Sequence, residues 1–344
     1  MPSTDDTLAA GRDALVLRSP DALVSALPYL VGFTPHASIV LMWVTRGRLL
    51  LTQRMDLPAG DPSEEFLDVM WAHEAAQQAE EVIVCVVTDG PRPAALVPAV
   101  IARAEVRGVC VRDVLVVDGL RWRSLLCEDP ACCPEAGREV DPSVLARLSA
   151  EFAVLGVAPR ECRADLEGEV ARDEVRATRL ARCLDEARHR EKSADRELWR
   201  DEAADQVGEL LRGCHARGPL TDEEVASIMV ALTDVRVRDT VLWESARLDA
   251  ESMRSAHALL QEVTRCAPDD VLAPVATCGA VLAWLIGDGA RALISIERAL
   301  AADGTYSLAC LVMTALRAGL PPTSWREAMT ELSREDCRMP RHAA

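Results

Sequence analysis

The N-terminal part of the chain alternates between apolar segments of strand length and longer amphipathic segments. Strands are predicted where β-branched and other apolar residues run together between turn residues. Arg46-Gly47 separates the first two of these segments and predicts a tight hairpin turn. The predicted strands are Ser38–Thr45, Arg48–Leu57, Glu81–Thr88, Val111–Asp118 and a last one over Arg121–Cys127.

Helices are predicted between these strands. Ser19-Pro20-Asp21 is a typical helix start, with a capping serine, a proline in the first turn and an early acid. That helix is expected to run to about Leu30, and further helices are expected over Pro62–Ala79 and Ala94–Arg107. Strands that alternate with helices predict an α/β domain over residues 1–140, with a mixed sheet, one hairpin and right-handed crossovers.

Beyond Asp141-Pro142 the apolar residues recur at helical spacing, which predicts an all-α region over residues 141–344. Helix caps are expected at Asp141, Thr221 and Asp269. Residues 160–205 are mostly charged and predict either an exposed long helix or a connecting arm. Residues 251–335 predict an array of helical hairpins similar to tetratricopeptide repeats, with Val271–Ile286 and Ala290–Ala302 as one small-residue pair.

Charge and lysine content exclude several function classes. The chain has 55 acidic against 38 basic residues and a formal charge of -17, so nucleic acid is not expected as a partner. Lys192 is the single lysine and has no glycine nearby, which rules out a phosphate-binding P-loop. It lies in a densely charged segment, which also argues against Schiff-base chemistry.

The apolar runs and the cysteines indicate a cytoplasmic protein. No run approaches the roughly 20 residues of a membrane-spanning helix, and residues 1–12 resemble neither a secretory signal nor an anchor. The 12 cysteines are scattered through predicted helices and strands, so reduced thiols are expected.

The most unusual local feature is a turn-rich segment with three cysteines, Cys127, Cys132 and Cys133. A metal site would need a fourth ligand from elsewhere, and neighbouring acids such as Glu128 disfavour a reactive thiolate. A structural loop with buried thiols is the favoured interpretation, and no cofactor is expected. Metal binding, a redox switch and a nucleophilic Cys127 stay open as alternatives.

A second candidate site combines polar residues at the ends of predicted strands. Ser38, Arg54, Asp56 and Ser124 are expected to converge on a small polar ligand, because ligands of α/β domains bind at strand ends. The simpler alternative is that Arg54 and Asp56, at alternate positions of one strand, only pair with each other.

Several ordered motifs resemble the actinobacterial domain of unknown function 4192 family. The resemblance implies a cytoplasmic actinobacterial protein and carries no activity, cofactor or catalytic residue with it. The motifs are Pro28-Tyr29-Leu30-Val31-Gly32-Phe33-x-Pro35-x-x-Ser38, Arg54-x-Asp56-Leu57-Pro58, Trp122-x-Ser124-x-x-Cys127 with Cys132-Cys133-Pro134, and Trp284-x-x-Gly287-Asp288-Gly289-Ala290.

These patterns favour a ligand-binding or regulatory protein. The α/β domain would hold a small polar ligand, and the helical region would present a surface to a protein partner. The alternative is a thiol-dependent transferase or hydrolase that uses Cys127, with Arg54 and Asp56 orienting its substrate. A zinc-stabilised fold is the third hypothesis.

Overall fold

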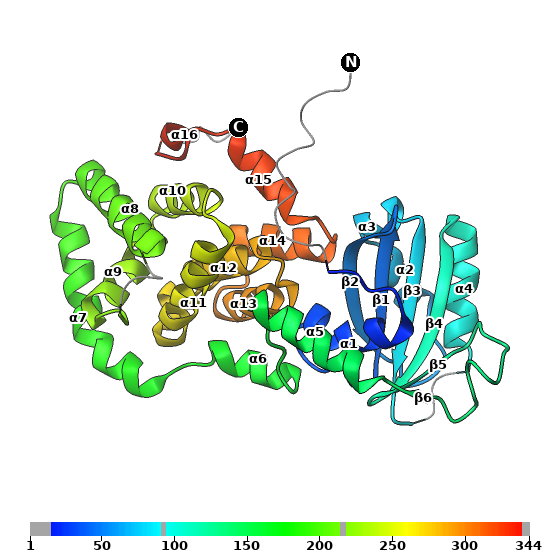
Figure 1. Ribbon diagram of the computed structural model, residues 1–344. Helices are drawn as coiled ribbons and strands as arrows, with labels where there is room; N and C mark the ends of the chain where they lie inside the picture. Colours follow the sequence, from blue (N-terminus) through cyan, green and yellow to red (C-terminus); the bar gives the residue numbers. More distant parts are fainter. Residues whose placement is uncertain (1–14, 91–93, 214–217, 339–344) are drawn as a thin grey trace, which may run out of the picture. The chain divides into compact units, whose positions relative to one another are not determined.

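The computed structural model describes residues 15–90, 94–213 and 218–338, which fold as two compact units (Figure 1). The described residues of the first unit fall within Met1–Leu67 and Ala79–Arg160, and those of the second within Asp68–Gln78 and Glu161–Ala344. The expectation for residues 1–12, that they form no signal or anchor, lies outside the described residues.

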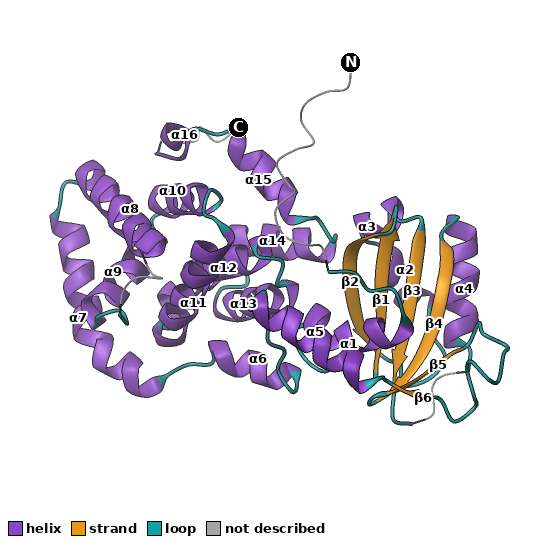
Figure 2. Cartoon of the chain, viewed as in Figure 1, coloured by secondary structure: helices purple, strands orange, loops and turns teal. Residues whose placement is uncertain are grey.

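The first unit contains a six-stranded mixed sheet, as the α/β pattern predicts (Figure 2). Its order is β2-β1-β3-β4-β5-β6; among the described strands only β3 and β4 pair in parallel, and the other neighbours are antiparallel. The two-residue β6 was not predicted. The strands are β1 (Ser38–Thr45), β2 (Arg48–Asp56), β3 (Glu81–Val87), β4 (Cys110–Asp118), β5 (Arg121–Ser124) and β6 (Arg138–Glu139).

Burial explains why β1 and β3 form the centre of the sheet. Residues 38–44 of β1 and 82–87 of β3 are all buried, and a strand that is covered on both faces needs such a continuous apolar run. A polar pair lies within this layer: Trp43 Nε1 donates to Gln53 Oε1 of β2 at 3.1 Å, with both residues buried.

Helices α1 (Pro20–Val31), α4 (Leu96–Arg107) and α5 (Pro142–Val154) also belong to the first unit. Ser19 caps α1 as predicted. The ring of Tyr29 on α1 stacks on Phe152 of α5 at 4.2 Å between centroids, and the Tyr29 hydroxyl donates to Ser149 at 2.9 Å. This packing extends the first unit to Arg160, past the predicted limit at residue 140.

The single helix predicted over Pro62–Ala79 is two short helices, α2 (Glu64–Trp71) and α3 (Glu74–Gln78). The backbone N–H of Glu74 donates to the carbonyl oxygen of Ala318 at 2.8 Å, so it cannot continue the helical hydrogen bonds of α2. A tertiary contact therefore overrides the local helical pattern here.

The second unit is helical, as the 3.6-residue periodicity predicts. α12 is its most buried element, since every residue from 271 to 285 is buried. The helices are α6 (Arg163–Val170), α7 (Glu174–Ser193), α8 (Arg196–Gly213), α9 (Asp222–Thr233), α10 (Val235–Ser245), α11 (Ala250–Cys266), α12 (Asp269–Leu285), α13 (Gly289–Ala302), α14 (Ser307–Arg317), α15 (Pro322–Thr330) and α16 (Arg334–Arg338).

α12 and α13 form the predicted hairpin around the turn at Gly287. Small residues of both helices, Ala280 and Ala292 among them, are fully buried, which allows close approach of the two backbones. Asp269 is not the cap of α12, because the helix already begins at that residue and Pro268 holds the capping position. The similarity to tetratricopeptide hairpins stays a prediction.

The charged segment 160–205 is not an extended exposed arm. α7 packs against α9 and buries a strip of its surface, formed by Leu180, Cys183, Leu184 and Ala187. Several of its arginines have partners on other helices; Arg179, for example, donates to Asp222 at 2.5 and 2.9 Å. The charged segment therefore contains a narrow apolar helix face that its overall composition does not reveal.

None of the helices in the described ranges is long and apolar enough to cross a membrane.

Asp249 provides a test of helix capping in the second unit. It caps α11 by accepting the N–H groups of Glu251 and Ser252 at 2.9 and 3.0 Å, and the hydrogen bonds from Ser252 lower its pKa from 3.8 to about 2. Its carboxylate therefore stabilises the fold above about pH 4, and this contribution is lost as the pH falls towards 2.

We expect Asp249→Asn to lose less stability than the wild type between pH 4 and pH 2, because asparagine caps without titrating. Urea unfolding at both pH values measures this difference. Glu251→Gln, which removes an exposed charge from the same helix turn and leaves the cap in place, is the matched control. Equal acid sensitivity of Asp249→Asn and wild type would contradict the assignment.

Candidate metal centre

Ser38, Arg54 and Asp56 lie together at one end of the β1–β2 hairpin. Ser38 pairs in register with Asp56, and Arg54 Nε donates to Ser38 Oγ at 2.8 Å. The guanidinium also pairs with Asp56 Oδ1 at 2.5 Å and lies 5.6 Å from the centre of the Phe33 ring. Three of the four polar residues that were predicted to converge are therefore in contact with one another.

The contacts of this group are mostly internal. Ser38 is fully buried and its hydroxyl donates to the carbonyl oxygen of His36 at 2.6 Å. The Arg54 side chain is 19% exposed, while that of Asp56 is 82% exposed. Arg54 therefore bridges β1, β2 and the Phe33 ring, as the simpler pairing interpretation predicts, and Asp56 faces solvent.

Ser124 does not join this group. It aligns across the sheet with Leu115, Cys85, Val40 and Arg54, so three strands separate it from Arg54. At the usual strand spacing the two backbones lie about 19 Å apart. The predicted site is thus divided into two places, and Ser124 belongs with the cysteine loop.

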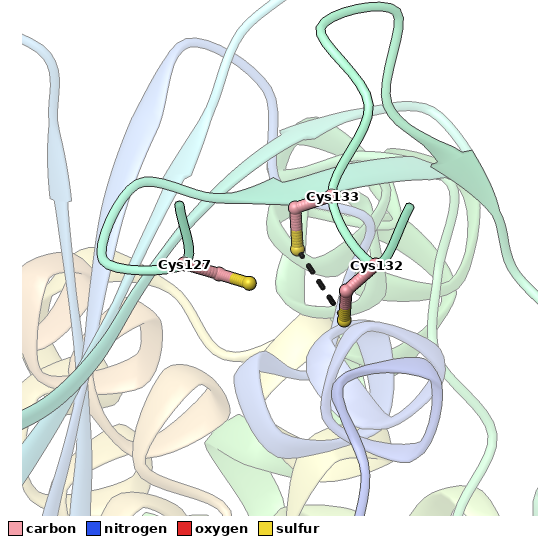
Figure 3. Close-up of side chains that lie close together, drawn as sticks. All are labelled: Cys127, Cys132 and Cys133. Atoms are coloured by element: carbon pink, nitrogen blue, oxygen red, sulfur yellow. Dashed lines mark hydrogen bonds between the residues drawn. The ribbon is translucent and has the colours of Figure 1, made fainter. Parts of the chain in front are cut away.

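The thiols of Cys127, Cys132 and Cys133 form one cluster (Figure 3). Their sulfur atoms all lie within 4.8 Å of one another, and Sγ of Cys132 and Cys133 are 4.0 Å apart. Cys133 is buried, Cys127 is half-buried and Cys132 is exposed. The loop therefore gathers three sulfur atoms at a place that solvent reaches from the side of Cys132.

Local hydrogen bonds fold the loop around these thiols. Ser124 Oγ accepts the backbone N–H groups of Leu126 and Cys127, each at 3.2 Å, which turns the chain at the end of β5. The carbonyl oxygen of Asp129 accepts the N–H groups of Cys132 at 3.1 Å and Cys133 at 2.7 Å. These two turns bring Cys127 back towards the other two cysteines.

The loop returns to the sheet through Gly137. This residue has a φ of 74°, and a Cβ atom there would lie 3.2 Å from the carbonyl oxygen of Trp122. Arg138, which follows it, donates to the carbonyl oxygen of Cys132 at 3.2 Å and pairs β6 with β5. Glycine is needed here both for the left-handed conformation and for the close approach of the two backbones.

The electrostatics favour a bound cation over a free nucleophile. Burial raises the pKa of Cys133 to about 11, with the Ser124 backbone N–H opposing this and the thiols of Cys127 and Cys132 adding to it. Cys133 is therefore a protonated thiol at neutral pH unless a cation replaces its proton. The carboxylates of Glu128, Asp129 and Glu135 add negative potential around the loop.

The sulfur positions fit a thiolate metal site. A Zn–S bond of about 2.3 Å in tetrahedral geometry separates two sulfur atoms by about 3.8 Å, close to the 4.0 Å between Cys132 and Cys133. No histidine, cysteine or acid of the described residues joins the three as a fourth ligand in this cluster. A metal ion held here would keep one coordination position for a ligand from solvent.

Asp113 is a further polar residue beside the loop that was not predicted from the sequence. The Ser124 hydroxyl donates to Asp113 Oδ1 at 2.6 Å, and burial, followed by the charge of Asp113, raises the pKa of Cys85 to about 12. The available signal was an acid within the mostly apolar β4. Its position relative to β3 depends on a register shift between Val82 and Ile83, which no local pattern predicts.

Comparison with known proteins gives a family and no activity. Residues 20–323 match the family described as Domain of unknown function (DUF4192), which covers most of the chain, so the protein belongs to that family. No curated protein and no solved structure matches the chain.

We expect Gly137→Ala to destabilise the first unit by about 1 to 2 kcal/mol, through its left-handed backbone and the contact with Trp122. Gly119→Ala is the matched control, since Gly119 also has a positive φ of 56° but no atom lies within 4 Å of its Cβ position. Thermal unfolding of the two variants measures the difference. A control that loses as much stability as Gly137→Ala would show that the close contact contributes nothing.

Proposed function

We propose that this member of the domain of unknown function 4192 family binds one Zn²⁺ ion through the thiolates of Cys127, Cys132 and Cys133. The observation that carries this proposal is the convergence of three sulfur atoms within 4.8 Å of one another in one loop. The sequence pattern favours a purely structural loop, whereas the grouping of the three sulfur atoms favours a metal site.

Charge favours a divalent ion over a monovalent soft ion such as Cu⁺. Three thiolates with Zn²⁺ leave a net charge of about −1, whereas Cu⁺ would leave about −2 among the carboxylates of Glu128, Asp129 and Glu135. Thiolate ligands also exclude Mg²⁺ and Ca²⁺, which prefer oxygen. Zinc is therefore the ion whose charge and ligand preference both suit the loop.

The bound ion would supply a ligand-binding position. Three protein ligands leave the fourth corner of a zinc tetrahedron for water or for a small molecule, which is the arrangement of sites that exchange ligands. On this basis we propose a small-ligand-binding or regulatory protein, in which the ligand occupies the open position on the zinc ion. It would act in the cytoplasm, where thiols stay reduced.

The alternative of a thiol-dependent transferase or hydrolase has less support. Arg54 and Asp56, which were expected to orient its substrate, lie on β2, with three strands between them and β5. Burial raises the pKa of the neighbouring Cys133 thiol, so Cys133 itself is not an activated nucleophile in the absence of a cation. Zinc binding needs no such activated nucleophile, and it uses all three sulfur atoms.

Purified under reducing conditions, the wild type should contain about one zinc ion per chain, and Cys127→Ser, Cys132→Ser and Cys133→Ser should each contain almost none. Elemental analysis after gel filtration measures the ratio. Cys110→Ser, which changes an exposed cysteine of β4, is the control and should keep its zinc. Equal zinc in all four variants, or a Cys127 disulfide in the wild type, would refute the site.

For the helical unit we propose the role of partner surface. A cavity of about 620 Å³ opens between α7, α8 and α9, with Ala187, Ala203 and Val230 on its floor and Trp199 in its wall. Its polar rim includes Glu202 and Glu223. A concave surface that combines an aromatic side chain, an apolar floor and charged edges suits the side chain of a docked protein segment.

A bulky residue in this cavity should block such a partner. We expect Ser227→Trp to lose partners that co-purify with the wild-type chain, while Glu209→Trp, an exposed position of α8 outside the cavity, retains them. Affinity purification with quantitative mass spectrometry compares the three proteins. Identical partner profiles for both variants would show that the cavity is not the docking site.

A further inference from the structure

The cavity between α7, α8 and α9 is built from packed helices. α9 contacts both α7 and α8 (Figure 1), and the cavity of about 620 Å³ opens between the three. Its lining residues recur three or four positions apart along a helix, as Trp199, Glu202 and Gln206 do on α8. Ala187 and Ala203 of its floor belong to the hydrophobic core of the second unit. The shape of the cavity is therefore present before a partner binds.

Carboxylates outnumber cationic groups in this cavity. Among the described lining residues, Glu202, Glu223 and Glu224 face the single guanidinium of Arg190, with His189 counted as neutral. The whole chain has a formal charge of -17, so its wider field has the same sign. Both the local and the overall charge therefore favour a cationic occupant.

Glu202 and Glu223 are available to such an occupant. Both are exposed, and the Glu202 side chain has no hydrogen bond or ion pair with another described residue. Among the described residues the Glu223 carboxylate accepts only the weak thiol donor of Cys183, at 4.0 Å. Glu224 differs, since its carboxylate accepts the backbone N–H of Thr221 at 2.9 Å and stabilises the start of α9. Two of the three carboxylates can therefore receive a cation without breaking a contact that holds the fold.

We propose that the cavity binds an arginine side chain from a basic segment of a partner protein. This inference rests on the partner surface proposed above for the helical unit and names the chemistry of its partner. The methylene stem of the arginine would pack on the apolar floor, while its guanidinium would lie against Trp199 and donate to Glu202 and Glu223. Arginine and tryptophan are also among the residue types that contribute most to binding at protein interfaces.

Other occupants fit this lining less well. An acidic segment would be repelled by Glu202 and Glu223, and a purely apolar segment would cover their carboxylates without offering a donor. Lysine supplies the charge, but its ammonium is a compact, strongly hydrated group without a planar face to stack on an indole ring. Arginine is therefore the side chain that uses the floor, the aromatic wall and the carboxylates together.

The first test measures binding of a fluorescently labelled tetra-arginine peptide to the full chain by fluorescence anisotropy, at about 0.15 M salt. Glu202→Gln/Glu223→Gln should weaken binding about tenfold, since two charge-assisted hydrogen bonds are lost. Ser227→Trp, which fills the cavity, should abolish it. The matched control is Glu186→Gln/Glu209→Gln, which removes two exposed acids of α7 and α8 outside the cavity and should bind like the wild type.

Trp199→Leu tests the aromatic wall. The wild type should bind tetra-arginine about threefold to fivefold more tightly than tetra-lysine. The variant should bind the two peptides equally, because leucine keeps an apolar wall but offers no π face. The ratio of the two affinities is measured within one protein, so a partial loss of folded chain does not change it.

An equal loss of tetra-arginine binding in the two double variants would reveal general attraction to the acidic chain and overturn the proposal. So would the absence of tetra-arginine binding to the wild type. If Ser227→Trp then still loses co-purifying partners, the partner surface stands and only its preference for arginine fails. Peptide binding that depends on Glu202 and Glu223, with no partner lost in Ser227→Trp, supports the arginine site and refutes the proposed partner surface.

Discussion

The candidate metal centre depends on one hydroxyl group. Ser124 Oγ donates to Asp113 of β4 and accepts two backbone N–H groups of the following turn, so it links the end of β5 to both the sheet and the loop. A hydroxyl has one hydrogen and two lone pairs, and all three are used here. The direction in which the chain leaves β5, and with it the position of Cys127, follows from this saturation.

In the second unit, the corresponding constraint is that half-buried arginine side chains need acceptors for their N–H groups. The chain carries a large excess of acids, and several of its half-buried arginines contact two or more acceptors, as Arg176 does with Glu262, Asp222 and the carbonyl oxygen of Leu220. Burial of an ion is tolerated best when acceptors surround it.

The two candidate sites of the first unit differ in how much of each was visible in the sequence. The three cysteines attract attention because they stand close together in a turn-rich segment, and short-range turns alone bring their sulfur atoms into range. Ser38, Arg54 and Asp56 lie in contact because they share one hairpin, and their binding of a ligand stays a prediction. Ser124 lies apart from them, because strand order decides that distance and the order of strands is not a local property.

The sequence by itself determined the features that depend on neighbours along the chain. β1 lies where a continuous apolar run predicts it, and Ser19, Asp141 and Thr221 cap the helices that follow them. Tertiary structure decided the rest: the break between α2 and α3, and the partner of Ser124. The physical reason is that periodicity and capping act over one or two turns, whereas burial and charge compensation act between elements that only the fold brings together.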